Sequence, residues 1–124
     1  MEKLVIHGRT PLKGEVTISG AKNAAVAILP ATLLINGTCT LNNVPNIRDV
    51  KMSCEILEAL GATIKWNDVN SLTIDTTKVS SENTPLELTR KFRASYYLIG
   101  SMLGRTKKIE VGLPGRVQYR CQAY

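Results

Sequence analysis

Cysteine, histidine and aromatic residues are scarce in this sequence. The three cysteines (Cys39, Cys54 and Cys121) share no metal-like spacing, and their odd number excludes a fully paired disulfide framework. Cys39 and Cys54 stand among apolar neighbours, which predicts small buried side chains. The single histidine, His7, follows a short apolar stretch, which favours a structural histidine over a catalytic one. The sequence therefore predicts no metal site.

Long hydrophobic runs are absent as well. No apolar stretch approaches the ~20 residues that a membrane helix needs, and the apolar part of the N-terminus is too short for a secretory signal. The 124 residues are 44% hydrophobic and 21% charged, which is typical of a globular domain. We expect one modest cytoplasmic domain with no membrane partner.

Acidic residues are outnumbered, since ten Asp plus Glu face sixteen Lys plus Arg and leave a net charge of +6. Such an excess suits nucleic acid, a membrane surface or anionic small molecules. The charges are dispersed, and aromatic residues make up 5% of the chain, so stacking platforms for bases are scarce. Anionic small molecules fit best, and a basic module that binds anions or nucleic acid is the alternative.

Local patterns predict an α+β chain of short strands and three helices. The strands are expected at residues 16–18, 39–41, 63–66, 71–75 and 109–111. The helices are expected at residues 22–35, 50–60 and 90–103. Asp49 is expected to cap the second helix, and Pro30 to kink or interrupt the first. Gly37, Gly61 and Gly104 are expected to end the three helices.

The chain repeats itself at a fixed offset. Lys22 matches Lys91, 69 residues later (91 − 22 = 69). The same offset pairs Ala25 with Ala94, Leu29 with Leu98, Leu34 with Leu103 and Pro45 with Pro114. Residues 22–75 therefore form one complete unit, and a second unit begins and is not completed. Repeated units bury their shared core against one another, so an incomplete repeat is expected to leave hydrophobic surface open.

Cations stand at the start of two predicted helices. Residues 19–23 (SGAKN) join a strand to a helix, and a helix N-terminus offers unpaired amides that suit phosphate. Lys22 adds a charge and Asn23 a donor, although the same residues also make an ordinary helix start. Arg90 and Arg93 open the third helix, where cations oppose the helix dipole. An anionic partner and a plain basic surface are both compatible with that helix.

Taken together, these motifs resemble the UDP-N-acetylglucosamine enolpyruvyl transferases of the EPSP synthase family. Residues 14–25 (GEVTISGAKNAA) are similar to the family's opening signature. Further family motifs follow in order at residues 43–45 (NVP), 60–62 (LGA), 93–95 (RAS) and 113–115 (LPG). The resemblance covers residues 1–115.

The resemblance implies transfer of enolpyruvyl from phosphoenolpyruvate to the 3-hydroxyl of UDP-N-acetylglucosamine, with release of phosphate. This is the first committed step of peptidoglycan synthesis and uses no cofactor. Lys22 and Asn23 match the phosphoenolpyruvate-binding pair, and Arg93 matches an arginine that contacts the UDP-sugar. The sister enzyme of the shikimate pathway is rejected, because its lysine stands in a Pro-Gly-Asp-Lys-Ser context.

The family fold has two domains, each an inside-out α/β barrel of three βαβαββ repeats, with the site between the domains. On this basis residues 1–20 are strands that belong with the partner domain. Residues 21–115 hold about one and a half repeats of the other domain. Residues 116–124 form a tail foreign to the family.

The tail lacks the family's proton-donor loop. Val117 stands where the family has the cysteine that protonates the enolpyruvyl carbon, Gln122 stands at the loop arginine, and Cys121 comes four positions too late. One permitted back-translation, with a single base removed from the Arg116 codon, reads Gly-Gly-Cys-Asn-Ile-Gly-Val-Arg-Pro-Ile, the family loop. We therefore expect a one-base insertion, no intact catalytic residue and an inactive chain, with an inert truncation product as the alternative function.

Overall fold

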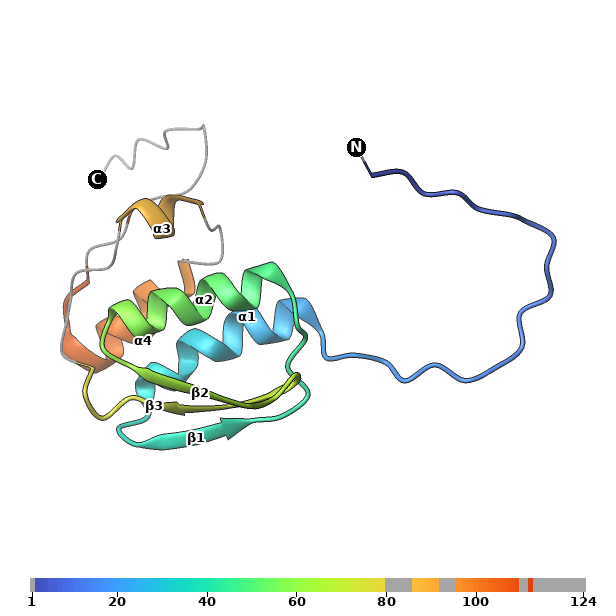
Figure 1. Ribbon diagram of the computed structural model, residues 1–124. Helices are drawn as coiled ribbons and strands as arrows, with labels where there is room; N and C mark the ends of the chain where they lie inside the picture. Colours follow the sequence, from blue (N-terminus) through green and yellow to red (C-terminus); the bar gives the residue numbers. More distant parts are fainter. Residues whose placement is uncertain (1, 80–85, 92–95, 110–111, 113–124) are drawn as a thin grey trace.

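The computed structural model describes residues 2–79, 86–91, 96–109 and 112. Its elements are α1 (Lys22–Ala31), the 3-10 helix η1 (Thr32–Leu34), β1 (Thr38–Leu41), α2 (Arg48–Ala59), β2 (Thr63–Asp68), β3 (Ser71–Asp75), α3 (Leu86–Lys91) and α4 (Tyr96–Thr106). The strands form one antiparallel sheet in the order β1-β3-β2, and the helices lie on one face of it (Figure 1). The α+β class predicted from the sequence is confirmed.

The first helix begins at Lys22 as predicted, in a run of good helix formers. Pro30 has no backbone N–H and cannot continue the hydrogen-bond ladder. The chain tightens into η1 at Thr32, whose hydroxyl donates to the Leu29 carbonyl at 2.6 Å. The predicted irregularity at Pro30 is therefore confirmed, and it turns the chain toward β1.

The predicted hairpin is also confirmed, with a tighter turn than expected. β2 continues through Asp68, so the turn consists of Val69 and Asn70. The Asn70 amide donates to the Asp68 carboxylate at 2.7 Å, an Asx-type contact that favours a tight turn. Leu72 and Ile74 of β3 are fully buried beneath the helices.

The core lies between the sheet and helices α1, α2 and α4, and Met102 of α4 is part of it. Two pairs from the sequence repeat have similar exposure. Leu29 and Leu98 are both buried, whereas Leu34 and Leu103 are 59% and 44% exposed. The five-pair repeat includes residues outside the described ranges and stays a prediction.

The expectations for residues 16–18, His7 and Gly104 are wrong. Residues 16–18 form no strand, because residues 2–19 extend away from the body and no other described strand pairs with them (Figure 1). His7 lies in this segment and is exposed rather than packed. Gly104 does not end the last helix, which continues to Thr106 before Lys107 adopts a left-handed conformation (φ 65°). The strand expected at 109–111 falls mostly outside the described residues.

Arg105 fastens α4 to the rest of the body. Its guanidinium donates to the carbonyls of Leu33 at 2.9 Å, Thr76 at 2.7 Å, Ile35 at 3.1 Å and Val79 at 3.4 Å. The planar fork of arginine suits several acceptors at once. One side chain therefore joins the last helix to the end of η1 and to the segment after β3.

Candidate functional site

The start of α1 carries the family's opening motif. Ala21 is the N-cap, in an extended conformation (φ −74°, ψ 129°), and no side chain caps the helix there. The first turn contains no acidic residue. The free amides and the positive end of the helix dipole therefore face outward together, as an anion requires.

Gly20 lets the backbone before α1 pass close to the loop after β1. A Cβ at this position would lie 1.8 Å from the Asn43 carbonyl oxygen, so no larger residue fits without displacing the loop. Asn43 itself has a left-handed backbone (φ 56°), and the next amide, Val44, donates to the Asn70 carbonyl at 2.8 Å. The β2–β3 turn thus anchors the loop, and a hollow of about 230 Å³ lies between the loop and α1.

Lys22 and Asn23 are both exposed at this helix start. The Lys22 ammonium lies 2.5 Å from the Asp49 carboxylate of α2. The expectation that Asp49 caps α2 is wrong, because Ile47 is the N-cap and no side chain caps that helix. Asp49 stands instead in the first turn, where an acid is favourable to the helix dipole and the carboxylate can reach across to α1.

Two other positions compared with the family's site, Arg93 and Val117, fall outside the described residues. Arg93 comes between α3 and α4, and Val117 belongs to the tail. The structure therefore brings Lys22 and Asn23 together and leaves Arg93 as a prediction. Within the described ranges, no three His, Cys, Asp or Glu residues are grouped so as to hold a metal. No helix of that same part of the chain is long and apolar enough to span a bilayer.

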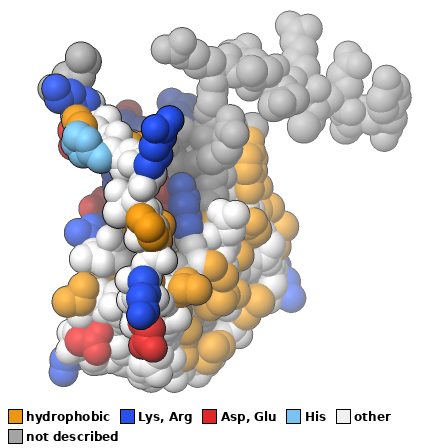
Figure 2. Space-filling model, turned by 90° about the vertical axis from the view of Figure 1, so that its right-hand side faces the viewer, with side chains coloured by type: hydrophobic (Ala, Val, Ile, Leu, Met, Phe, Trp, Pro, Cys, Tyr) orange, Lys and Arg blue, Asp and Glu red, His pale blue; other side chains and the backbone are white. Residues whose placement is uncertain are grey.

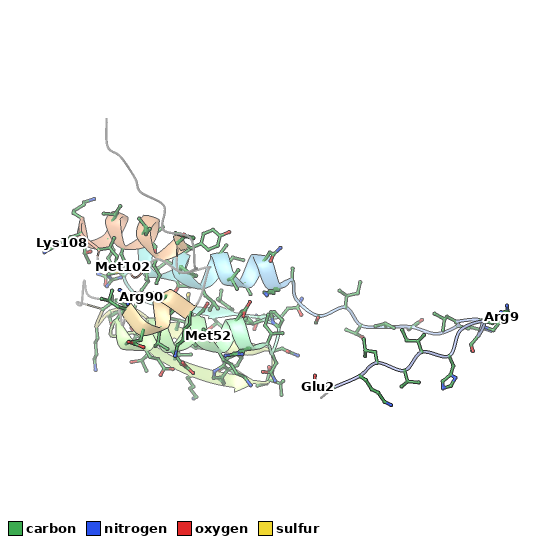
Figure 3. All side chains as sticks on the ribbon, turned by 90° about the horizontal axis from the view of Figure 1, so that it is seen from above. Glu2, Arg9, Met52, Arg90, Met102 and Lys108 are labelled. Atoms are coloured by element: carbon green, nitrogen blue, oxygen red, sulfur yellow. The ribbon has the colours of Figure 1, made fainter. Side chains whose placement is uncertain are left out.

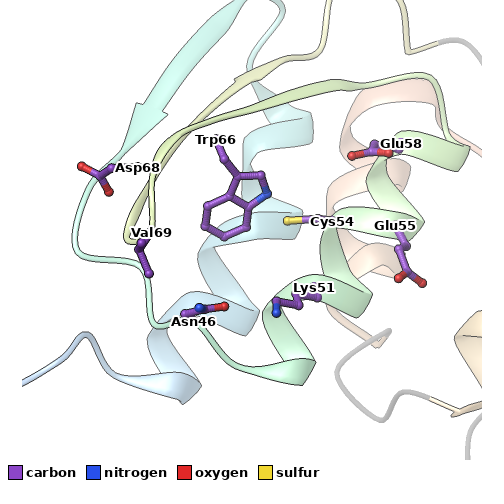
Figure 4. A pocket seen from close by; sticks show the side chains of 8 residues that line it. All are labelled: Asn46, Lys51, Cys54, Glu55, Glu58, Trp66, Asp68 and Val69. Atoms are coloured by element: carbon purple, nitrogen blue, oxygen red, sulfur yellow. The ribbon is translucent and has the colours of Figure 1, made fainter.

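A larger groove of about 670 Å³ lies between α2 and β2. The Cys54 sulfur points toward the Trp66 indole, and Lys51 and Asn46 lie at one end (Figure 4). Burial, with smaller contributions from Glu58 and Glu55, raises the pKa of the Cys54 thiol to about 11. The thiol is therefore protonated at neutral pH and is a poor nucleophile. Of the residues predicted for the site, the described ones, Lys22 and Asn23, do not line this groove.

Asp49 is the site residue whose role sequence reasoning missed. A carboxylate just inside a helix start resembles a cap, and the two positions differ by a residue or two. Its ion pair joins positions 22 and 49, which no local pattern connects. The available signal was the charge of Asp49 next to the family motif at residues 43–45.

Comparisons with known proteins find similar sequences over most of the chain. The chain is 54% identical over 116 residues to UDP-N-acetylglucosamine 1-carboxyvinyltransferase from Clostridium botulinum, and the match covers 93% of the chain and 28% of that relative. The Streptococcus pneumoniae enzyme of the same name is 49% identical, with 93% of this chain and 27% of the relative covered. The chain thus spans little more than a quarter of the length of these relatives.

A solved structure has the same fold. The enolpyruvyl transferase NikO from Streptomyces tendae superposes with a TM-score of 0.69 at 26% identity, covering 82% of this chain and 23% of that chain. Residues 6–121 match the family described as EPSP synthase (3-phosphoshikimate 1-carboxyvinyltransferase). Since that match covers nearly the whole sequence, the chain belongs to the EPSP synthase family.

Proposed function

We propose that this chain is the phosphoenolpyruvate-binding part of an enolpyruvyl transferase that acts on UDP-N-acetylglucosamine. The reaction joins the enolpyruvyl group to the 3-hydroxyl of the sugar and releases phosphate. The observation that carries the proposal is the uncapped start of α1, where the family motif places Lys22 and Asn23 beside free amides. The names of the most similar relatives favour UDP-N-acetylglucosamine over shikimate phosphate as the acceptor.

Each proposed site residue has a distinct part. Lys22 supplies a full positive charge to the phosphate of phosphoenolpyruvate, and the helix amides supply directed donors. Asn23, exposed in the first turn, donates a further hydrogen bond. Arg93 contacts the UDP-sugar, whose diphosphate suits a guanidinium.

We also propose that residues 1–20 pack with a second domain and that residues 21–115 belong to a larger set of repeats. In support, Leu4, Leu12 and Ile18 are 92%, 96% and 85% exposed on a segment that leaves the body. Hydrophobic side chains also gather over part of the surface (Figure 2). The exposed hydrophobic side chains on α1, η1 and α4 include Ile28, Leu34, Tyr97 and Leu103. Such surface is typical of units that bury a shared core.

Residues 116–124 are proposed to come from a shifted reading frame. Val117 then replaces the proton-donating cysteine, and we propose that the chain alone has no turnover. The test is the DNA sequence across the Gly115 and Arg116 codons. An extra base followed by an open frame that continues the family supports the shift, and a clean codon without such a frame overturns it.

The anion site is tested by titrating the 124-residue chain with phosphoenolpyruvate and following its amide resonances. We expect the largest shifts at Lys22, Asn23 and Ala24. K22A should abolish them, and K51A, which removes the same charge from an exposed position on α2, should leave them unchanged. Equal titration of K22A and K51A would contradict the proposed site.

The acceptor is tested in a chimera that joins residues 1–115 to the remaining part of the Clostridium botulinum relative. We expect phosphate release that requires both phosphoenolpyruvate and UDP-N-acetylglucosamine. R93A should raise the KM for the UDP-sugar more than that for phosphoenolpyruvate. A chimera that prefers shikimate 3-phosphate would refute the proposed acceptor.

A further inference from the structure

The ion pair between Lys22 and Asp49 joins the starts of two helices. Lys22 is the first residue of α1, and Asp49 is the second residue of α2. Their charged groups are 2.5 Å apart, with the side chains 59% and 28% exposed. The two helices pack against each other, so the contact spans an interface that the core already fixes.

Without a partner, the Lys22 ammonium would not be held close to the amides at the start of α1. The positive end of the helix dipole repels a cation there, and lysine has a long side chain with many rotamers. An anion site at this place needs the ammonium and the amides close together, although the two repel each other. A nearby carboxylate removes that conflict.

Asp49 is well placed to act as this carboxylate. It makes no capping bond to its own helix, and its charge is favourable in the first turn of α2. The buried residues Val50, Ser53 and Cys54 hold that turn in place. The carboxylate is therefore fixed on the body of the protein, whereas the lysine that it holds is on the exposed side.

We propose that Asp49 is the positioning residue for Lys22 in the anion site, an inference that rests on the proposed function. The ammonium has three N–H donors. One stays with Asp49, and the others turn to the phosphate of phosphoenolpyruvate. Asp49 does not touch the ligand, and it acts by keeping Lys22 in the conformation that binds.

The sign of the effect on affinity distinguishes positioning from simple electrostatics. D49N removes a negative charge close to the anion, which by electrostatics alone would tighten binding. Positioning predicts the reverse, and for a half-exposed pair we expect phosphoenolpyruvate and inorganic phosphate to bind about three- to fivefold more weakly. D49E, which restores the carboxylate, should recover most of the affinity. E55Q makes the same charge change elsewhere on α2 and should have no effect.

A ligand-free measurement keeps this inference separate from the proposed function. In the 124-residue chain labelled with ¹³C at lysine Cε, relaxation should give a higher order parameter for Lys22 than for exposed Lys51. D49N should lower the Lys22 value to that of Lys51, and D49E should restore it. Equal values in the parent chain and D49N would overturn the positioning role, whether or not an anion binds.

The two failures then have different signatures. If the parent chain and K22A respond identically to phosphoenolpyruvate, the proposed anion site fails, even when Asp49 orders Lys22. If K22A abolishes binding but D49N binds phosphate as tightly as the parent chain or more tightly, the positioning role fails and the site stands. In urea unfolding, D49N should lower the folding equilibrium constant relative to E55Q by only about two- to fivefold, the value of a half-exposed ion pair and a favourable first-turn charge, which excludes a general loss of structure as the cause.

Discussion

Replacing Arg105 should destabilise the protein more than the loss of any other exposed or half-buried cation that the structure describes. Its guanidinium donates to four carbonyls, in η1, just after η1 and after β3. R105A leaves the carbonyls of Leu33, Ile35, Thr76 and Val79 without this donor. The closest contacts, at 2.7 and 2.9 Å, are those to Thr76 and Leu33.

The magnitude follows from the number of contacts and their exposure. A hydrogen bond to a charged group contributes about 1.5–3 kcal/mol. Arg105 is half-buried, so water replaces part of what is lost, and the 3.4 Å contact to Val79 adds little. We expect R105A to lower the free energy of unfolding by about 2–4 kcal/mol. R105K should lose about 1–2 kcal/mol, because lysine keeps the charge but lacks the fork.

Urea unfolding followed by the fluorescence of Trp66, the single tryptophan, measures this loss. R9A is the matched control, since Arg9 lies at the far end of the extended segment, away from Met102 in the core (Figure 3). The midpoint should fall for R105A and stay unchanged for R9A, with the same m-value throughout. If R105A and R9A unfold at the same urea concentration, the four Arg105 hydrogen bonds contribute nothing to stability and this prediction is wrong.

Three further changes test separate parts of the structure. G20A should lower the free energy of unfolding by about 1–3 kcal/mol, because its Cβ would collide with the Asn43 carbonyl, and an unchanged urea midpoint would refute that close approach. T76V should lower the free energy of unfolding by about 1–2 kcal/mol in the same assay, because the buried Thr76 hydroxyl donates to the Ile35 carbonyl. T76S keeps the hydroxyl and should lower the free energy of unfolding less. Cys54 should be alkylated at pH 8 about 100-fold more slowly than an exposed thiol, because burial raises its pKa to about 11 and leaves little thiolate. Because the pKa of the Cys54 thiol is higher in the folded than in the unfolded state, the thiol's contribution to stability is present below about pH 9 and is lost as the pH rises toward 11. C54A should therefore reduce the fall of the urea midpoint over this alkaline range.

Elements encoded by local patterns could be predicted from the sequence. The helical spacing of Val50, Cys54 and Leu57 predicts α2, and all three side chains are buried in it. Turn residues between two alternating runs predict the β2–β3 hairpin. In both cases the signal lies within one short stretch of the chain, so no knowledge of distant contacts is needed.

Features that depend on distant partners could not be predicted. Residues 16–18 alternate like a strand, but a strand forms only beside another strand, and the described part of the chain supplies none. Arg105 donates to the carbonyls of Leu33 and Ile35, which are 72 and 70 residues away in the sequence. An arginine near a helix end gives no local sign of such acceptors.

The candidate site divides in the same way. Lys22 and Asn23 are adjacent in a contiguous motif, so the sequence indicated both, together with the helix start that presents them. The local pattern predicts that Asp49 caps α2, whereas its carboxylate pairs with Lys22 of α1. Residues that contact a ligand can follow from a motif, whereas the residue that holds them depends on how two helices pack. For that reason the test of D49N against E55Q examines the part of the site that only the packing of α1 on α2 could reveal.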